Sequence, residues 1–190
     1  VNLIIAPYNY PVGLTFAPLT AAIAAGNTAV IKTSEMTPAC SAVICKIIAE
    51  TFDSDYIAYI EGEVKETTIL LQQKFEHIFF TGSPRIGSIV MSAAAKNLSP
   101  VTLELGGKSP CIVHDDAKLD ITVNRIVCSK FLNAAQTCVA PDYVLVHKSV
   151  KEAFLSKLKD RIIKTYGEDA STSSDFARIV SDNHFQRICG

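Results

Sequence analysis

The chain has 190 residues, of which 48% are hydrophobic, and a formal net charge of −1 at pH 7. This length and apolar content suffice for one large or two small globular domains with buried cores. The near-neutral charge, without a Lys/Arg cluster, argues against nucleic acid and against an anionic membrane surface as partners. The longest apolar tract, residues 14–26, is interrupted by Pro18 and is too short to span a bilayer, so a small-molecule partner is expected.

Strand and helix patterns alternate through the first hundred residues. The expected strands cover residues 1–6, 28–32, 57–60 and 77–81, and the expected helices cover residues 11–25, 38–52, 64–72 and 85–96. Strands and helices that alternate with short turns are typical of parallel sheets. The pattern predicts an α/β fold with a Rossmann-like parallel sheet that has helices on both faces.

Two of these helices carry apolar residues three and four positions apart, which places them on one side of each helix. The expected buried faces are Val43, Ile44, Ile47 and Ile48 in the second helix and Ile86, Ile89, Val90 and Ala93 in the fourth. Thr37 is expected to cap the second helix, with Pro38 at its first position.

The pattern changes at Gly106-Gly107. An apolar run covers residues 109–114, followed by an expected helix at 119–132, a strand at 143–147, an amphipathic helix at 150–166 and a polar surface loop at 169–175. These elements predict the start of a second α/β domain, with domain ranges of 1–106 and 107–190. Because the sequence begins and ends abruptly, we expect a piece of a longer protein.

The hexapeptide GSPRIG, residues 82–87, follows a predicted strand and opens a predicted helix. Ser83 is expected to cap this helix, with Pro84 at its first position. A helix start of this kind offers backbone N–H groups and a positive dipole end to a pyrophosphate. The spacing is not GxGxxG, so plain helix capping is the alternative. The GKS at 107–109 is not a P-loop, because Thr102 stands where that motif needs glycine.

Lys32, Ser34 and Glu35 follow the second predicted strand, at the edge where open α/β sheets bind ligands. An acidic residue there can accept hydrogen bonds from ribose hydroxyls, and a lysine can bind the ribose or offset phosphate charge. Taken alone, either residue is more often a solvated loop charge.

Glu104 lies between two leucines in the β-rich run VTLELGGKSP, residues 101–110. An ionised carboxylate inside an apolar strand is costly, and loss of water would raise its pKa toward that of a general base. A strand-end glutamate that faces solvent is the alternative.

Cys138 lies in a different setting from the other cysteines, after polar Gln136 and Thr137 and before Pro141. This pattern indicates a loop in which a thiol is accessible to substrate. Thiolate chemistry also needs an oxyanion donor and a base, which Asn9 and Glu104 could supply.

No other cysteine or histidine motif supports a competing chemistry. The remaining cysteines are expected to be small buried residues with reduced thiols, as in a cytoplasmic protein: Cys40, Cys45, Cys111, Cys128 and Cys189. The scattered histidines support neither a Cys-His peptidase nor a metal site, and no metal is expected.

Five segments resemble, in order and approximate spacing, those of the aldehyde dehydrogenase superfamily. They are PYNYP (7–11), AAGNTAVIKTSE (24–35), FTGSPRIG (80–87), LELGGKSP (103–110) and QTCVAPDYV (136–144). The phrases FFTGSPRIG, VTLELGGKSPC and CVAPDYVLV are most similar to the class 3 and fatty aldehyde dehydrogenase branch. That branch oxidises medium-chain, long-chain and aromatic aldehydes with NAD and sometimes NADP.

The resemblance implies a catalytic role for three residues. Cys138 would attack the aldehyde as a thiolate, and the Asn9 amide and the Cys138 backbone N–H would hold the oxyanion. Hydride would pass to the nicotinamide. Glu104 would then activate the water that hydrolyses the thioester.

The resemblance also implies a cofactor site for NAD, with NADP possible. Lys32 and Glu35 match residues that bind the adenosine ribose, Ser83 matches a pyrophosphate contact, and Ile86 would pack near the adenine. The full set of implied cofactor residues is Lys32, Ser34, Glu35, Gly82, Ser83, Ile86, Gly87, Leu105 and Gly106. Glu35 is expected to repel a 2′-phosphate and so to favour NAD.

The chain departs from the family pattern at three positions and in its length. Tyr8 replaces a usual Trp, Thr33 a usual Pro, and Ala135 a common Gly. If residue 135 has a positive φ, alanine there would cost on the order of 1 kcal/mol. Family members are several hundred residues long, so the expectation is an active intact homodimer and a weak or inactive isolated piece.

Two alternatives to a hydrolytic aldehyde dehydrogenase remain. An acylating relative would pass the thioester to coenzyme A, although Glu104, as a water-activating base, favours hydrolysis. The other alternative is a non-catalytic nucleotide-binding fragment or a degenerate paralogue. The presence of Cys138, Glu104 and Asn9 together argues against a degenerate paralogue, but not against an inactive fragment.

Overall fold

The computed structural model describes residues 1–190, which form two compact units, Val1–Leu105 and Gly106–Gly190. Both units are built from alternating strands and helices, so the predicted α/β class is confirmed. The expected domain boundary, between residues 106 and 107, differs by one residue from this division.

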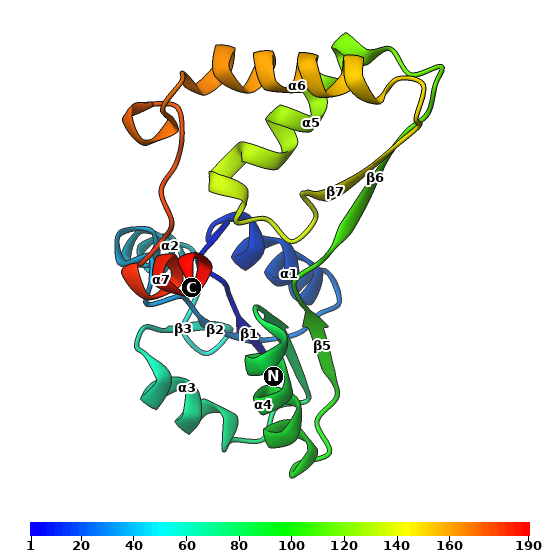
Figure 1. Ribbon diagram of the computed structural model, residues 1–190. Coiled ribbons are helices and arrows are strands. Elements are labelled where there is room, and N and C mark those ends of the chain that lie inside the picture. The colour runs from blue at the N-terminus through cyan, green and yellow to red at the C-terminus, as the bar shows by residue number, and fades with distance from the viewer. The chain divides into compact units, whose positions relative to one another are not determined.

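A five-stranded parallel sheet forms the centre of the first unit, with strand order β3-β2-β1-β4-β5 (Figure 1). Its strands are β1 (Asn2–Ile5), β2 (Ala29–Lys32), β3 (Ile57–Ile60), β4 (His77–Thr81) and β5 (Val101–Glu104). The apolar run at the start of the chain supplies the central strand, which pairs in parallel with β2 and β4. A strand with two neighbours and helices on both faces is buried throughout, which explains why β1 is almost wholly apolar.

Side chains that alternate along β1 divide the core into two layers. Leu3 and Ile5 pack with residues of α3 (Val64–Leu71) and α4 (Pro84–Ala95) on one face. Ile4 packs with residues of α1 (Gly13–Ala24) and α2 (Pro38–Thr51) on the other face. The two helix pairs lie on opposite sides of the sheet in Figure 1.

All five strands are parallel, so the loops that follow them leave the sheet at one edge. The strand order reverses at β1, because β2 and β3 lie on one side of it and β4 and β5 on the other. Open α/β sheets bind ligands at such a switch point, outside the carboxyl ends of the strands. The loops after β1 and β4 therefore border the expected binding crevice.

The second unit contains a two-stranded parallel sheet and three helices. The sheet pairs β6 (Ser109–Val113) with β7 (Pro141–Val146), and the helices are α5 (Leu119–Phe131), α6 (Lys151–Tyr166) and α7 (Asp182–Cys189). Val113, Val123 and Phe154 are fully buried between β6, α5 and α6. Two short 3-10 segments, Leu132–Ala135 and Ala170–Thr172, complete the unit.

The predicted buried faces of α2 and α4 are only partly correct. Ile44 and Ile48 are buried as expected, but Val43 is 57% exposed and Ile47 is 43% exposed, while Ser41 and Cys45 take their places. In α4, Ile89 is 52% exposed. An α-helix has 3.6 residues per turn, so the sheet covers only one side of it. In α2 this side carries Ser41, Ile44, Cys45 and Ile48, and Val43 and Ile47 lie outside it.

Two further local predictions are wrong. The Thr37 side chain makes no capping hydrogen bond to α2, and its hydroxyl oxygen is buried without a partner. Pro38 alone therefore marks the start of that helix. Among the five cysteines expected to be buried, Cys40, Cys128 and Cys189 are exposed because they lie on the outer sides of helices, and Cys111 is half-buried.

One helix was not predicted. Helix α7 follows Ser181, whose hydroxyl accepts a hydrogen bond from the backbone N–H of His184. None of its residues is buried. Phe185 and Ile188 lie three positions apart on one side of the helix and are 49% and 58% exposed, and this spacing was the signal that could have identified the helix in the sequence. The helices of the chain are all too short or too polar to cross a membrane.

Candidate active site

Asn9 lies in the loop between β1 and α1, at the carboxyl edge of the sheet and beside the switch point. It is half-buried. The same loop is fastened to the helix that follows, since the Thr15 hydroxyl donates to the carbonyl of Pro11 at 2.6 Å. Asn9 therefore lies on a short segment that is anchored at both ends.

The end of β2 holds a buried lysine. Lys32 is 2% exposed, and its ammonium group donates to the Thr33 carbonyl at 2.6 Å and to the Glu35 carboxylate at 3.4 Å. Burial of an ammonium group is costly unless it is paired, so these two acceptors fix the side chain. The hydroxyl of Ser34 accepts from the backbone N–H of Met36 and orders the same turn. Glu35 keeps an outward-facing carboxylate beside a fixed positive charge, since its side chain is 41% exposed.

The start of α4 has the predicted cap. The Ser83 hydroxyl accepts from the Ile86 backbone N–H at 3.3 Å, and Pro84 is the first helical residue. The other N–H groups of a first helical turn have no partner within the helix and can bind an anion. Gly87 is buried so closely against β5 that a Cβ there would lie 2.9 Å from the Leu105 side chain. The capping prediction is confirmed, and pyrophosphate binding stays a prediction.

Glu104 is the last residue of β5 and pairs with Thr81 of β4. Its backbone carbonyl accepts a hydrogen bond from the Gly82 N–H at 2.9 Å. This bond joins the GSPRIG segment, residues 82–87, to the strand that carries the Glu104 carboxylate. The Glu104 side chain is exposed. The expected desolvated carboxylate is therefore wrong for this chain, because a strand-end position leaves the side chain in water.

Cys138 lies in a turn just after the 3-10 segment Leu132–Ala135, and it is half-buried. Three successive residues before it have left-handed backbone conformations, with φ of 53° at Asn133, 51° at Ala134 and 62° at Ala135. Ala135 therefore has the positive φ at which alanine is less favourable than glycine. Left-handed conformations cost L-residues other than glycine on the order of 1 kcal/mol each, and asparagine tolerates them best.

The Gln136 side chain holds this strained loop. Its amide nitrogen donates to the Asn133 carbonyl at 2.9 Å and to the Arg178 carbonyl at 3.1 Å, and its amide oxygen accepts from the Val180 N–H at 3.0 Å. The loop before the nucleophile is thus bound to a segment about forty residues later in the same unit. Sequence patterns did not identify this role, although an amide side chain next to a predicted nucleophile was a signal for it.

Gly107 contacts the nucleophile loop directly. A Cβ at Gly107 would overlap the backbone carbonyl oxygen of Cys138, whereas a Cβ at Gly106 would meet nothing within 4 Å. The second glycine of the LELGGKSP segment is therefore needed for a close backbone approach to Cys138. This role was not predicted.

The predicted residues fall into two groups, one in each unit. The residues placed along the carboxyl edge of the five-stranded sheet, or on α4 just behind it, are Asn9, Lys32, Ser34, Glu35, Gly82, Ser83, Ile86, Gly87, Glu104 and Leu105. Gly106 and Cys138 belong to the second unit. A separate group of exposed side chains, His114, Asp115 and Asp116, has ligand-type atoms within 4.8 Å of one another but includes none of the predicted residues.

Comparison with known proteins identifies the family. The sequence model of the aldehyde dehydrogenase family matches residues 1–190. The chain belongs to the aldehyde dehydrogenase family. The resemblance found in the five sequence segments is thereby confirmed, and the fold of the relatives is the α/β fold described above.

Two curated relatives and one solved structure are similar over almost the whole chain. The 4,4′-diaponeurosporen-aldehyde dehydrogenase of Staphylococcus aureus is 52% identical over 186 residues, 98% of this chain and 40% of the relative. The dimeric NADP-preferring aldehyde dehydrogenase of Mus musculus is 50% identical over 188 residues, 99% of this chain and 42% of the relative. The substrate-bound state of Staphylococcus aureus AldH superposes with a TM-score of 0.90 at 50% identity, over 98% of this chain and 41% of that one. The chain thus spans about two fifths of these aldehyde dehydrogenases.

Proposed function

We propose that the full-length protein oxidises an aldehyde to a carboxylic acid with NAD(P), through a covalent intermediate on Cys138. The observation that carries this proposal is the nucleophile loop. Cys138 lies on a strained turn, held by Gln136 and closely approached by Gly107, within a chain that matches the aldehyde dehydrogenase family from end to end. Strained backbone of this kind is concentrated at functional sites.

The donors at the sheet edge fit a dinucleotide. The first turn of α4 offers N–H groups suited to a pyrophosphate, and the close packing of Gly87 on Leu105 leaves the helix start near the sheet. The carboxylate of Glu35, beside the buried Lys32, is suited to accept hydrogen bonds from ribose hydroxyls. The bound cofactor would supply a hydride acceptor, while the residues of this chain bind it and orient it.

The proposed reaction uses three residues of the chain, and the bound dinucleotide would be the acceptor of the hydride. The Cys138 thiolate adds to the aldehyde carbon, and the oxyanion accepts hydrogen bonds from the Asn9 amide and the Cys138 backbone N–H. Loss of hydride leaves an acyl group on sulfur. The Glu104 carboxylate takes a proton from water, which attacks the acyl carbon and releases the carboxylic acid and the thiolate. The exposure of Glu104 supports access of water to this base.

We further propose long-chain, medium-chain or aromatic aldehydes as substrates, in agreement with the similarity to a 4,4′-diaponeurosporen-aldehyde dehydrogenase. A homodimer in the cytoplasm is part of the same proposal, and the name of the dimeric mouse relative supports the dimer. The first unit would bind the cofactor and the second would carry the nucleophile.

The test is reduced-cofactor formation by the full-length protein with hexanal and with benzaldehyde. Cys138→Ala is expected to abolish activity, while Cys128→Ala, which removes an exposed thiol of the same unit, is expected to leave it unchanged. Acid and reduced cofactor should form in equal amounts without coenzyme A. Unchanged activity in Cys138→Ala would contradict the proposed nucleophile, and a requirement for coenzyme A would identify an acylating enzyme instead.

A further inference from the structure

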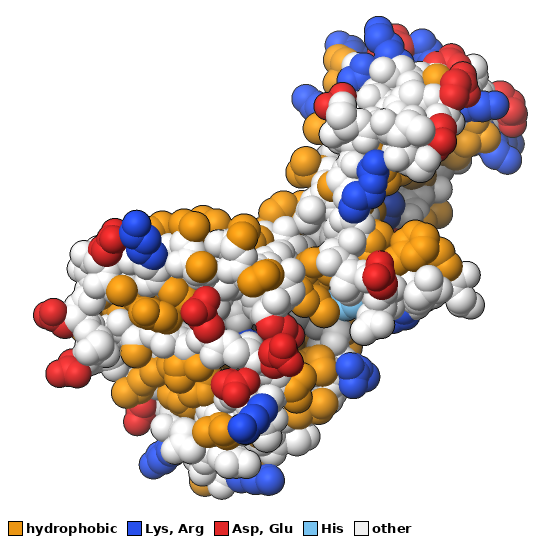
Figure 2. All heavy atoms as spheres, turned by 90° about the vertical axis from the view of Figure 1, so that its left-hand side faces the viewer, with side chains coloured by type: hydrophobic (Ala, Val, Ile, Leu, Met, Phe, Trp, Pro, Cys, Tyr) orange, Lys and Arg blue, Asp and Glu red, His pale blue; other side chains and the backbone are white.

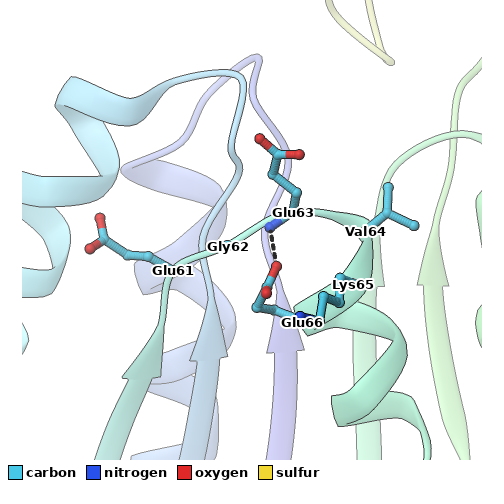
Figure 3. A pocket seen from close by; sticks show the side chains of 6 residues that line it. All are labelled: Glu61, Gly62, Glu63, Val64, Lys65 and Glu66. Carbon is cyan, nitrogen blue, oxygen red and sulfur yellow. Dashed lines mark hydrogen bonds between the residues drawn. The ribbon is translucent and has the colours of Figure 1, made fainter.

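The loop between β3 and α3 surrounds an open hollow at the carboxyl edge of the first sheet. Its volume is about 880 Å³, it is wide open to solvent, and all of its lining residues come from this one segment. The residues that line it are Glu61, Gly62, Glu63, Val64, Lys65 and Glu66 (Figure 3). Three carboxylates and one ammonium group therefore surround it. No part of this loop was singled out from the sequence.

This loop is adjacent to the Lys32–Glu35 turn. Lys32, the last residue of β2, is the Cα partner of Ile60, the last residue of β3. Because the two strands are parallel, the segments that follow them leave the sheet side by side. Glu61 is the first residue after that pair. In sheets of this type an acidic residue after the second strand binds the ribose 2′-hydroxyl, so the next loop along the sheet borders the 2′ position.

At the start of α3, a carboxylate of the helix itself already accepts a hydrogen bond from the backbone. The Glu66 side chain accepts from the Glu63 backbone N–H at 2.8 Å (Figure 3). That hydrogen bond, with smaller contributions that include the Lys32 charge, lowers the pKa of the Glu66 carboxyl. Gly62 has a φ of +138°, and a Cβ there would overlap the Glu66 side chain. Glu66 is thus packed under the loop, in the place where a helix start would otherwise receive a phosphate.

The ammonium group nearest to the expected ribose position already has hydrogen-bond partners within the chain. The Lys32 ammonium group is buried and bound to Thr33 and Glu35, and Lys65 is the only cation among the residues that line the hollow. The Glu61 and Glu63 carboxylates extend from the loop in different directions and are exposed (Figure 3). Figure 2, seen from the side where β3 and α3 lie in Figure 1, shows acidic side chains grouped on this face.

We propose that Glu61 and Glu63 exclude a 2′-phosphate, so that the full-length enzyme selects NAD over NADP. The inference rests on the proposed function, since it concerns the cofactor of that reaction. A 2′-phosphate adds close to two negative charges and needs a cation nearby, whereas a 2′-hydroxyl needs only an acceptor. Like charges near a binding site raise the free energy of the charged ligand and leave a neutral hydroxyl almost unaffected.

The competing hypothesis is that Lys65 binds the phosphate. It has support in the name of the NADP-preferring mouse relative. The two hypotheses predict opposite effects of neutralisation. Loss of Glu61 and Glu63 should strengthen NADP binding if they repel the phosphate, whereas loss of Lys65 should weaken NADP binding strongly if this lysine is the phosphate ligand.

The experiment measures the Kd of NAD⁺ and NADP⁺ for the full-length protein by calorimetry without aldehyde. The variants are Glu61→Gln, Glu63→Gln, the double variant and Lys65→Gln. Glu50→Gln serves as the control, because it removes an exposed carboxylate on α2 of the same unit. Low ionic strength is used first, since screening at about 0.1 M salt limits exposed charges to roughly 10 Å.

The double variant is expected to bind NADP⁺ about three- to tenfold more tightly, with NAD⁺ changed less than about twofold, and this gain should shrink with added salt. Equal shifts for both dinucleotides, or no shift relative to Glu50→Gln, would overturn the inference alone. A large loss of NADP⁺ affinity in Lys65→Gln, with tight binding in the unsubstituted protein, would also overturn it. If the unsubstituted protein binds neither dinucleotide, the proposed function fails as well.

Discussion

The start of α4 and the loop that carries Cys138 fix a backbone segment in different ways. At α4 the constraint is local, because Ser83 caps the helix and Pro84 follows it directly. At Cys138 the preceding residues have left-handed conformations, and the constraints come from Gln136 bonds to residues 178–180 and from Gly107. The helix cap at α4 depends on only one or two side chains. The nucleophile loop instead depends on contacts from distant parts of the second unit, so single changes there should have larger effects.

The largest effect is expected for Gly107→Ala. The added Cβ would overlap the Cys138 carbonyl and displace the nucleophile, and overpacking of this kind costs about 1–3 kcal/mol. Because the displaced Cys138 carries this cost into the barrier of the thiolate attack, aldehyde oxidation by the full-length protein should fall by about five- to 150-fold, since 1.4 kcal/mol corresponds to tenfold. Gly13→Ala is the control, because a Cβ there meets nothing within 4 Å and Gly13 has no assigned role in the site. Equal losses in both variants would show that the close approach is not the cause.

The next effect is expected for Gln136→Ala, which removes hydrogen bonds to Asn133, Arg178 and Val180. A typical hydrogen bond contributes about 0.5–1.5 kcal/mol net, and these three are part-buried or exposed, so both the free energy of unfolding and kcat should fall. The alkylation rate of Cys138 should change, while alkylation of the exposed Cys128 should not. Gln136→Glu should be intermediate, since it keeps an acceptor for Val180 and loses the donors. Gln186→Ala on α7 is the control, and the prediction is wrong if its effect is the same.

Ser83→Ala should have a moderate effect. Loss of an N-cap hydroxyl lowers the free energy of unfolding by about 1 kcal/mol. Dinucleotide affinity should fall with it, because the first turn of α4 would fray. Ser88→Ala, at an exposed position inside the same helix, should change neither quantity. A stable Ser83→Ala protein with unchanged affinity would separate the cap from cofactor binding.

The smallest effect, and the one with opposite sign, is expected for Ala135→Gly. Glycine relieves the left-handed strain at φ 62°, although it also increases the entropy of the unfolded chain. A net gain in the free energy of unfolding of up to about 1 kcal/mol is expected. The same change at Ala153, exposed on α6, should lower it by about 0.5–1 kcal/mol. Thermal unfolding measures both, and a loss at both positions would contradict the strain assigned to residue 135.

The sequence predicted what is encoded locally. The expected strand at 57–60 and the cap at Ser83 agree with the structure, because periodicity, proline and capping residues act over a few positions. The exposure of Val43 and Ile47 was not predictable, since α2 is apolar on more than one side and only the sheet selects a face. The exposure of Cys40, which also lies on α2, was not predictable for the same reason.

The nucleophile loop shows the limit most clearly. Cys138 was identified by its polar neighbours, but no local rule predicts left-handed backbone at two successive alanines. The residues that follow these alanines contact residues 107 and 178–180, and local sequence patterns do not show which distant residues are in contact. The hollow between β3 and α3 was missed for a related reason, because charged loop residues in a sequence do not indicate which strand end lies beside them.

The hydrogen bond from the Gly82 N–H to the Glu104 carbonyl couples the two ends of the proposed reaction. One loop would receive the pyrophosphate, and the other carries the proposed base. Neither can shift alone without loss of a backbone hydrogen bond, whose net worth is about 0.5–1.5 kcal/mol. In the proposed function, a dinucleotide that shifts the Gly82 loop would therefore also shift the strand end that carries Glu104, and any such coupling would be reciprocal.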